Sequence, residues 1–317
     1  MLPTPVRFVS GSLSFFAVLL LATAAVMVRG EPGWPVTVRD ALKRTVKIDA
    51  VPQRIVSLAP SNTEILFAVG AGDRVVGVTS YCNFPAEAQT RPRVGGFSGS
   101  TVNLEALLAL RPDLVVAGDE YHRTVIEALT RAGIPTVSIK ARDFNGVYDS
   151  ILTIGRLTDR SPAAAAVVDG LRERVDAVAA RVAKIRPVDR LRVYWEVFDA
   201  PVITTARSSI IGQLIELAGG LNVFAEIDGE FPQVSTEAVM ARDPQVILGP
   251  DMAQGDPLTA ERVRLRTGWS RIDAVQTGRV HSLSADLTSR PGPRLVDGLE
   301  LVAHTLYPAR FPAEPPR

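Results

Sequence analysis

The longest regular pattern of apolar positions lies in the middle of the chain. From Ser161 to Ile185 apolar residues recur at alternating spacings of four and three, and Pro187 follows the last of them. This spacing predicts one amphipathic helix about 36 Å long. We interpret its stripe as the face of a helix that lies across two lobes. A helix that pairs with a coiled-coil partner is the alternative.

Similar stretches flank that pattern on both sides. Residues 61–77 align with residues 211–225, and each stretch is a helical segment that ends in small residues before an apolar run. Residues 103–118 align with 235–250, and each of these reads as a short capped helix, a proline and a buried strand. Chance similarity is the alternative, but two matched pairs in the same order indicate two lobes of similar fold.

Apolar runs alternate with helical segments within each lobe. Residues 54–58, 114–117 and 135–139 read as buried strands, and residues 123–132 read as a helix. Strand, helix and strand at this spacing predict parallel units, while the weak alternation over 36–49 predicts an edge hairpin. We therefore predict an α/β fold of two similar lobes, each a central, mostly parallel sheet flanked by helices. The predicted bounds are 36–158 for the N-terminal lobe, 159–187 for the connecting helix and 188–317 for the C-terminal lobe.

The first 30 residues have a different composition from the rest. Arg7 is the only charged residue among the first 28, and residues 8–28 are almost wholly apolar or small. This composition predicts a signal peptide over residues 1–30, and hence a periplasmic or other extracytoplasmic protein. An uncleaved anchor is the alternative, because about 20 apolar residues can span a bilayer.

Composition also narrows the classes of function. The net charge of +1 argues against nucleic acid as the main partner. The chain has three histidines and one cysteine, none at zinc-ligand spacing, and no nucleophile elbow, dinucleotide fingerprint or P-loop. No metal site, cofactor or catalytic residue is predicted, which favours a binding protein over an exported enzyme that acts in a cleft. The role of the single cysteine, Cys82, stays open.

Aromatic residues follow several of the predicted strands. Tyr81, Phe84, Phe97 and Tyr121 lie in loops of this kind, among glycines and hydroxyl-bearing residues. Ligands of open parallel sheets bind beyond the carboxyl ends of the strands. These loops are therefore candidates for the rim of a binding cleft, although ordinary turns would have the same composition.

Four blocks of sequence resemble those of a known family. They are residues 54–64, Tyr-Cys-Asn-Phe-Pro at 81–85, residues 103–116, and Phe-Pro-Gln-Val-Ser at 231–235. Over about residues 36–308 the chain resembles the periplasmic substrate-binding proteins of ABC importers, in the helical-backbone class that carries vitamin B12, haem and iron–siderophores. The second and fourth blocks are most similar to those of the cobalamin-binding branch. The resemblance implies two lobes joined by one long helix, which agrees with the repeats and the apolar stripe.

The resemblance also implies a ligand and a partner. We expect a monomer that captures a corrinoid between its lobes and delivers it to an ABC transporter permease. A corrin ring needs aromatic walls and already holds its cobalt, so the protein needs no metal ligand or cofactor of its own. The candidate ligand-binding residues are Pro60, Ser61, Tyr81, Phe84, Phe97, Tyr121, Trp195, Phe198, Phe231, Arg290 and Arg294.

Two other ligands of the class stay open. Haem would take Tyr121 or His122 as an axial ligand. A ferric siderophore is often anionic, and it would meet Arg290, Arg294 and Tyr121.

One acidic residue on the outer face of each lobe docks onto permease arginines in this family. The matching residues are Glu64 and Glu216. Glu64 also has a local explanation, because Ser61 and Glu64 have the spacing of a helix capping box. Glu216 would otherwise be an ordinary solvated helix residue.

Overall fold

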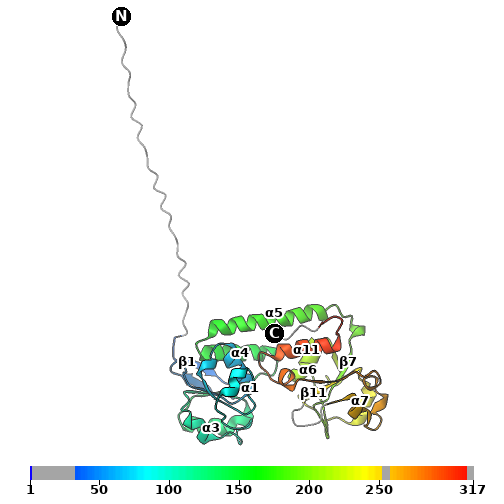
Figure 1. Cartoon of the computed structure of the whole chain (residues 1–317), viewed down its shortest axis with the longest axis horizontal. Helices are drawn as coiled ribbons and strands as arrows, with labels where there is room; N and C mark the ends of the chain where they lie inside the picture. Colours follow the sequence, from blue (N-terminus) through cyan, green and yellow to red (C-terminus); the bar gives the residue numbers. More distant parts are fainter. Residues whose placement is uncertain (2–32, 252–257, 313–317) are drawn as a thin grey trace. The chain divides into compact units, whose positions relative to one another are not determined.

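The computed structural model describes residues 1, 33–251 and 258–312. Contacts divide the chain into Met1–Gly33 and Trp34–Arg317, and the second unit holds every helix and strand given below (Figure 1). The predicted signal peptide therefore lies, apart from Met1, outside the described residues. None of the helices described here combines the length and apolarity needed to cross a membrane.

The N-terminal lobe contains a sheet of four parallel strands in the order β4-β3-β5-β6. An antiparallel hairpin, β1 (Val36–Arg39) with β2 (Thr45–Ile48), confirms the predicted edge element. The sheet strands are β3 (Ile55–Ser57), β4 (Val75–Val78), β5 (Leu114–Ala117) and β6 (Thr136–Ser138), and the helices are α1 (Pro60–Ala68), α2 (Leu104–Ala109), α3 (Arg123–Arg131) and α4 (Phe144–Leu157).

The C-terminal lobe contains a second parallel sheet, in the order β10-β7-β11-β12. A short hairpin, β8 (Phe198–Asp199) with β9 (Val202–Ile203), follows its first strand. The sheet strands are β7 (Arg192–Trp195), β10 (Leu221–Asn222), β11 (Val246–Pro250) and β12 (Val280–Leu283), and the helices are α6 (Ile210–Leu217), α7 (Thr236–Arg242), α8 (Ala260–Arg264), α9 (Asp273–Gln276), α10 (Ala285–Thr288) and α11 (Leu295–Leu306).

Both sheets have the same topology. Numbered within its own lobe, each sheet has the strand order second, first, third, fourth. The first pair of similar stretches forms α1 and α6, and the second pair forms α2–β5 and α7–β11. The prediction of two similar α/β lobes is therefore confirmed. Short 3₁₀ helices connect some elements: η1 (Gly72–Arg74), η2 (Ala86–Thr90), η3 (Glu120–His122), η4 (Pro187–Asp189) and η5 (Trp269–Arg271).

The long connecting helix is α5 (Ser161–Val182), of 22 residues. Its buried residues run from Ala164 to Val182 at the predicted spacing, and the helix packs on α4, α6 and α11 (Figure 1). The stripe is thus covered within the chain by helices of both lobes. The start of the helix at Ser161 agrees with the pattern, and the structure corrects its other end, because Ile185 lies beyond the last helical residue, Val182.

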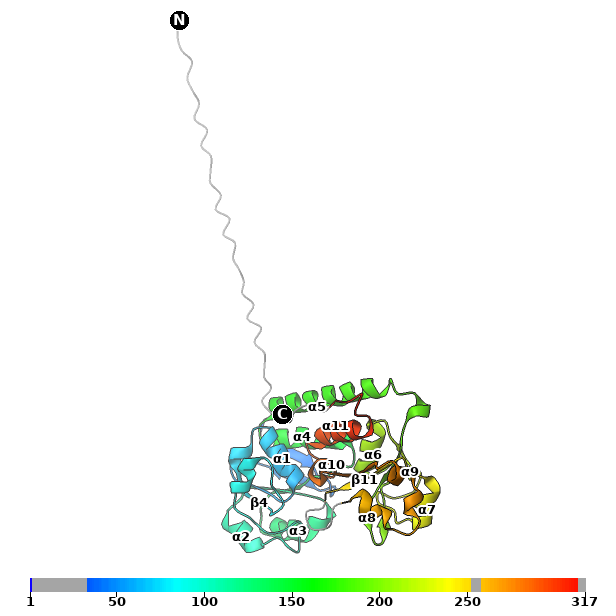
Figure 2. The ribbon, with the colours of Figure 1, turned by 45° about the vertical axis from the view of Figure 1, so that its right-hand side comes forward.

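One hydrophobic cluster extends through both lobes. It includes Ile65 of α1, Ile151 of α4, Val168 of α5, Leu214 of α6 and Leu299 of α11. Figure 2 shows the last helix, α11, below α5 and beside α6, and both of these contacts are made. The lobes therefore share this apolar cluster, and each lobe also has a cluster of its own, around Leu107 and Leu129 in the N-terminal lobe and around Phe224 and Trp269 in the C-terminal lobe.

Candidate ligand-binding cleft

A cavity of about 370 Å³ lies at the carboxyl ends of β3, β5 and β6. Segments that directly follow these three strands form most of its wall, and the segment 289–291 before α11 closes one side. Ligands of parallel sheets bind at this edge because the loops after the strands converge there. Six of the predicted ligand-binding residues line the cavity: Pro60, Ser61, Tyr81, Phe97, Tyr121 and Arg290.

Three aromatic rings form one wall of this cavity. Phe97 stacks on Tyr121 with ring centroids 4.7 Å apart and planes 18° apart, and Tyr81 meets Phe97 edge-on at 6.1 Å. Each of these three residues is between 42% and 51% exposed. Large aromatic surfaces left in contact with solvent are typical of a face that a ligand covers.

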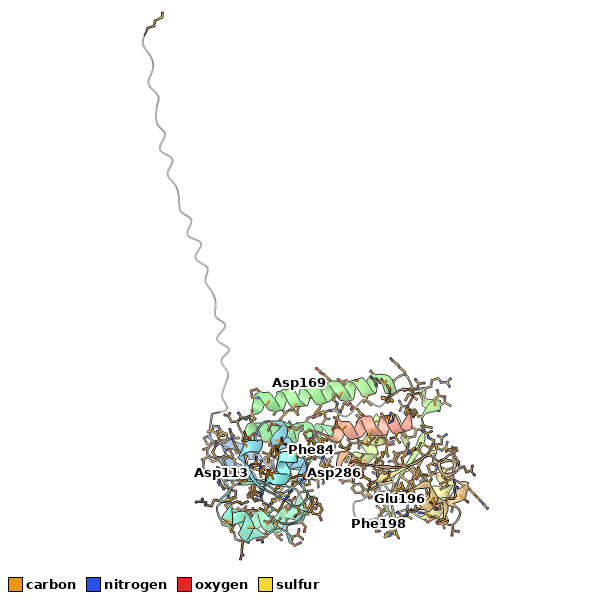
Figure 3. All side chains as sticks on the ribbon, viewed as in Figure 1. Phe84, Asp113, Asp169, Glu196, Phe198 and Asp286 are labelled. Carbon is orange, nitrogen blue, oxygen red and sulfur yellow. The ribbon has the colours of Figure 1, made fainter. Side chains whose placement is uncertain are left out.

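The second lobe adds aromatic residues at the corresponding edge of its sheet. Phe198 lies just beyond β7, close to Glu196 (Figure 3), and Phe231 lies in the loop before α7. Glu230, beside Phe231, approaches Arg142 of the N-terminal lobe to 3.5 Å, so this loop borders the gap between the lobes. Among the described residues, the exposed Phe and Tyr side chains are Tyr81, Phe84, Phe97, Tyr121, Phe198 and Phe231, all of them predicted.

The predicted contact from Trp195 is wrong. Trp195 is 0% exposed and belongs to the shared core, because its side chain faces inward from β7.

Phe84 lies outside the cleft cavity. It lines a second cavity, of about 470 Å³, beside Glu64, Phe67 and Ala68 of α1, and the Arg294 guanidinium lies 4.0 Å from the Phe84 ring centroid. Phe84 and Arg294 therefore contact each other rather than the predicted ligand space.

Charged side chains at the carboxyl edges of both sheets occur in pairs. Asp119 follows β5 and pairs with Lys140, which follows β6. Glu196 follows β7 and accepts a 2.8 Å hydrogen bond from Arg266. Neighbouring Tyr194 is buried, and burial raises the pKa of its phenol. The basic side chains at these edges and their partners are Lys140–Asp119, Arg142–Glu230, Arg262–Asp199, Arg266–Glu196 and Arg290–Asp286.

Sequence reasoning missed the acidic and basic residues of these pairs other than Arg290. The same rule that selected the aromatic loops would have found three of them, since Asp119, Lys140 and Glu196 each lie within two residues of the end of a strand.

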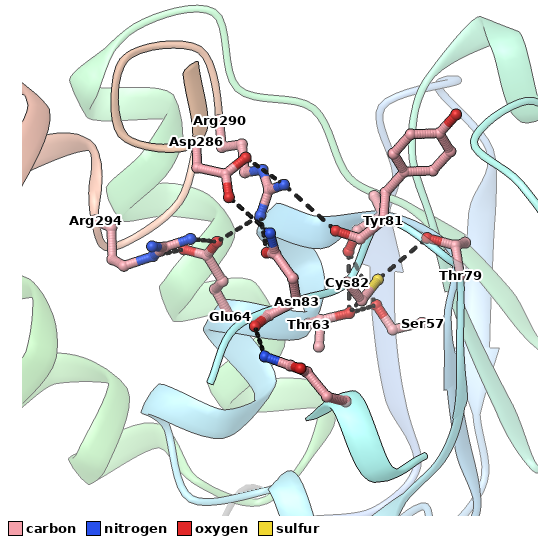
Figure 4. A network of polar contacts seen from close by, with 12 residues as sticks. Ser57, Thr63, Glu64, Thr79, Tyr81, Cys82, Asn83, Asp286, Arg290 and Arg294 are labelled. Carbon is pink, nitrogen blue, oxygen red and sulfur yellow. Dashed lines mark hydrogen bonds and ion pairs between the residues drawn. The ribbon is translucent and has the colours of Figure 1, made fainter. Parts of the chain in front are cut away.

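Glu64 is buried, contrary to the prediction of an acid on the outer face. Its side chain is 2% exposed and forms hydrogen bonds of 2.6 and 3.1 Å with Arg294, while Arg290 lies 3.5 Å away (Figure 4). The segment between α10 and α11 lies over the start of α1 and supplies both arginines. Glu216, on the equivalent helix α6, is 37% exposed and pairs with Arg207 at 2.7 Å.

The capping box predicted for α1 is also wrong. Ala59 precedes the helix and Pro60 is its first residue, so Ser61 lies inside the first turn. Thr63 donates its hydroxyl to Ser57 at 2.8 Å and contacts the buried Cys82 sulfur at 3.1 Å. Cys82 is thus held in a buried hydroxyl network behind the cavity.

His122 is unsuited to the axial role predicted for haem. It is fully buried, and its Nδ1 accepts a 2.8 Å hydrogen bond from the Gly118 N–H. Burial lowers the pKa of His122 to about 4, so the ring is in the neutral form that can bind a metal, and the obstacle is that the ring does not line the cavity. Tyr121, which does line the cavity, has its phenol pKa raised by burial and stays protonated.

The sequence of the chain is similar to a known protein family and to several of its members. The periplasmic binding protein family model matches residues 55–287. An uncharacterized ABC transporter substrate-binding lipoprotein of Bacillus subtilis, YvrC, is 32% identical over 93% of this chain and 97% of its own length. A cobalamin-binding protein of Halobacterium salinarum is 32% identical over 86% of this chain and 74% of its own length.

Solved structures share the fold and differ in ligand. The periplasmic vitamin B12-binding protein BtuF of Vibrio cholerae has a TM-score of 0.67 and 28% identity, over 82% of this chain and 98% of that one. The periplasmic haem-binding protein BhuT has a TM-score of 0.73 and 25% identity, over 82% and 100%. The fold alone therefore does not select the ligand. This chain belongs to the periplasmic binding protein family and is a solute-binding protein of the ABC importer class.

Proposed function

We propose that this protein binds a corrinoid of the vitamin B12 type in the cleft and delivers it to an ABC transporter permease. The observation that carries the proposal is an aromatic wall in a cleft whose basic groups each have an acidic partner. A large, flat ligand with a neutral, amide-bearing rim suits such a surface. The residues that we expect to contact it are Pro60, Ser61, Tyr81, Phe97, Tyr121 and Arg290 from the N-terminal lobe, with Phe198 and Phe231 from the other.

Haem and ferric siderophores fit the same fold less well at this site. Both ligands usually carry negative charge, and a bound anion gains most from cations that lack another partner. Here Lys140 and Arg290 already have the carboxylates of Asp119 and Asp286. Axial ligation of haem would also need His122 to leave its buried position or Tyr121 to ionise against the effect of burial.

A binding titration tests the proposal directly. The chain without its first 30 residues would be titrated with cyanocobalamin, aquocobalamin, cobinamide, haemin and several ferric siderophores, by calorimetry and visible absorbance. We expect one-to-one corrinoid binding without a change in the cobalt ligands. A haem spectrum shifted by axial ligation would favour haem, and turnover of any ligand would favour the enzyme alternative.

A pair of matched variants tests the location of the site. Phe97→Ala should weaken corrinoid binding about tenfold or more. A nucleobase stacked on an aromatic side chain contributes about 1–3 kcal/mol to binding, and we expect a similar contribution from the corrin ring on Phe97. Phe84→Ala removes an equally exposed ring from outside the cavity and should leave the affinity nearly unchanged. Equal losses in the two variants would argue against this cavity as the site.

We propose Glu216 as a permease-docking acid of a monomer in the periplasm, because its side chain is 37% exposed. Glu216→Arg should abolish uptake in cells and leave ligand affinity intact, because the helix that carries it lies away from the cavity. Glu64 does not share this role, because Arg290 and Arg294 cover its carboxylate and its side chain is only 2% exposed. Loss of ligand binding in Glu216→Arg would contradict the division of roles.

A further inference from the structure

The Asp119–Lys140 pair is a polar site within the aromatic wall of the cleft cavity. Asp119 and Lys140 follow the adjacent parallel strands β5 and β6, and both line the cavity beside Tyr121. Their side chains are 13% and 29% exposed, so both are only partly withdrawn from solvent. Asp119 precedes η3 but makes no side-chain cap to it, so its carboxylate is not used to hold that turn.

The pair leaves hydrogen-bonding capacity on both sides. The Lys140 ammonium has three donor hydrogens, and Asp119 Oδ2 takes one of them. Asp119 has a second carboxylate oxygen, Oδ1, for which no other hydrogen bond is described. A donor and an acceptor are therefore presented together, with no net charge on the pair, next to the aromatic ring of Tyr121.

Stability does not explain the pair well. Partly exposed ion pairs contribute about 0–1 kcal/mol to folding, because desolvation and side-chain ordering offset the attraction. Burial also lowers the pKa of the Lys140 ammonium, so the charged form is held there at some cost. A role in ligand recognition accounts for two charged residues at this position in an aromatic wall.

A primary carboxamide is the ligand group that matches this pattern. Its carbonyl oxygen accepts from an ammonium, and its NH₂ group donates to a carboxylate. A ligand carboxylate would also pair with Lys140, but it would be repelled by Asp119 and has no hydrogen to donate. We propose that Asp119 and Lys140 form a carboxamide-recognition subsite that selects corrinoids with an amide rim over those with a carboxylate rim.

This inference rests on the proposed corrinoid function and concerns which corrinoids are accepted. Cobinamide and cobyrinic acid, both saturated with cyanide, share one ring and differ mainly in whether the rim bears amides or carboxylates. Calorimetry at pH 7 would give the dissociation constant of each for the wild type, Asp119→Asn and Lys140→Gln. The control is Glu120→Gln, which neutralises the adjacent acid in a surface pair with Arg123 that does not line the cavity.

In Asp119→Asn the affinities for cobinamide and cobyrinic acid should change in opposite directions. The wild type should bind cobinamide more tightly than cobyrinic acid. Asp119→Asn frees the Lys140 charge, so cobyrinic acid should bind about tenfold more tightly and cobinamide about tenfold more weakly, since a hydrogen bond to a charged group is worth about 1.5–3 kcal/mol. Lys140→Gln should weaken binding of both, and of cobyrinic acid more.

The outcomes separate the two proposals. If the wild type binds neither corrinoid, the proposed function is overturned and this inference falls with it. If the wild type binds cobinamide but Asp119→Asn changes the ratio of the two constants no more than Glu120→Gln does, the subsite alone is overturned. Thermal melting of each variant checks its fold, and Lys140→Gln supplies an independent test if Asp119→Asn does not fold.

Discussion

Replacing Glu64 with glutamine should destabilise the protein far more than the same replacement of Glu216. Both acids lie on equivalent helices, both pair with arginine, and both changes remove one negative charge. They differ in burial, since the Glu64 side chain is 2% exposed and the Glu216 side chain 37%. The comparison therefore isolates the effect of burial on one kind of ion pair.

The structure sets the size of the expected effect. Removing one partner from a buried ion pair costs about 3–5 kcal/mol, because the remaining charge loses its compensation. Arg290 keeps Asp286 and Asn83 as partners, and both arginines retain some contact with solvent. We therefore expect the lower end of that range for Glu64→Gln, about 3 kcal/mol. The exposed Glu216–Arg207 pair should contribute less than about 1 kcal/mol.

Scanning calorimetry at pH 7 gives the measurement. The unfolding entropy is about 2.1 cal/mol/K per residue near 60 °C, so about 280 folded residues give about 0.6 kcal/mol/K. Glu64→Gln should then lower Tm by about 5 °C, and Glu216→Gln by less than about 2 °C. High salt should remove the smaller difference and leave the larger one, because buried pairs are screened less. Equal shifts in the two variants would refute the reasoning from burial.

Three further predictions follow from other parts of the structure. Burial lowers the pKa of His122 to about 4, so up to about 3 kcal/mol of folding stability, present above pH 6.5, should be lost as the pH falls toward 4. His122→Asn keeps an acceptor for the Gly118 N–H and should make the unfolding free energy, measured by urea titration, depend less on pH. An unchanged pH dependence in this variant would contradict the prediction. Trp195→Phe should lower the folding stability by about 1–3 kcal/mol and leave the affinity for cyanocobalamin unchanged. Weaker binding by a stably folded variant would show that Trp195 contributes to the ligand site. Small-angle scattering should show only slight compaction on ligand addition, because α5 and the shared core join the lobes; a large compaction would show that they move independently.

Local patterns were sufficient to predict the framework of the fold. The apolar stripe of α5 and the apolar runs of β5 and β11 are periodic patterns carried by residues close together in the sequence. Such patterns predict a helix or a buried strand without knowledge of the rest of the fold. Similarity between the two halves of the chain then predicted the repeated lobe, and the matching strand orders confirm it. The aromatic rim was found because residues after parallel strands share one edge of a sheet.

The errors come from contacts between residues far apart in the chain. Glu64 is buried by Arg294, 230 positions later, and no local pattern reports such a contact. Phe84 is turned away from the cavity by the same segment, through the Arg294 guanidinium over its ring. Trp195 shows a different limit, since a side chain within a strand can face either side of the sheet and the sequence does not state which.

The position of α11 constrains when this protein can finish folding. Synthesis is vectorial, and separate domains generally fold in the order in which they emerge. Here the last helix fills a place between α5 and α6 in an apolar core that begins with β1. An N-terminal half that emerges alone would leave the surface that α11 covers in contact with solvent. Such an apolar surface promotes aggregation and cleavage by proteases. The shared cluster should therefore be completed only after α11 is available, and a truncation before Leu295 should leave it open and lower the stability of both lobes.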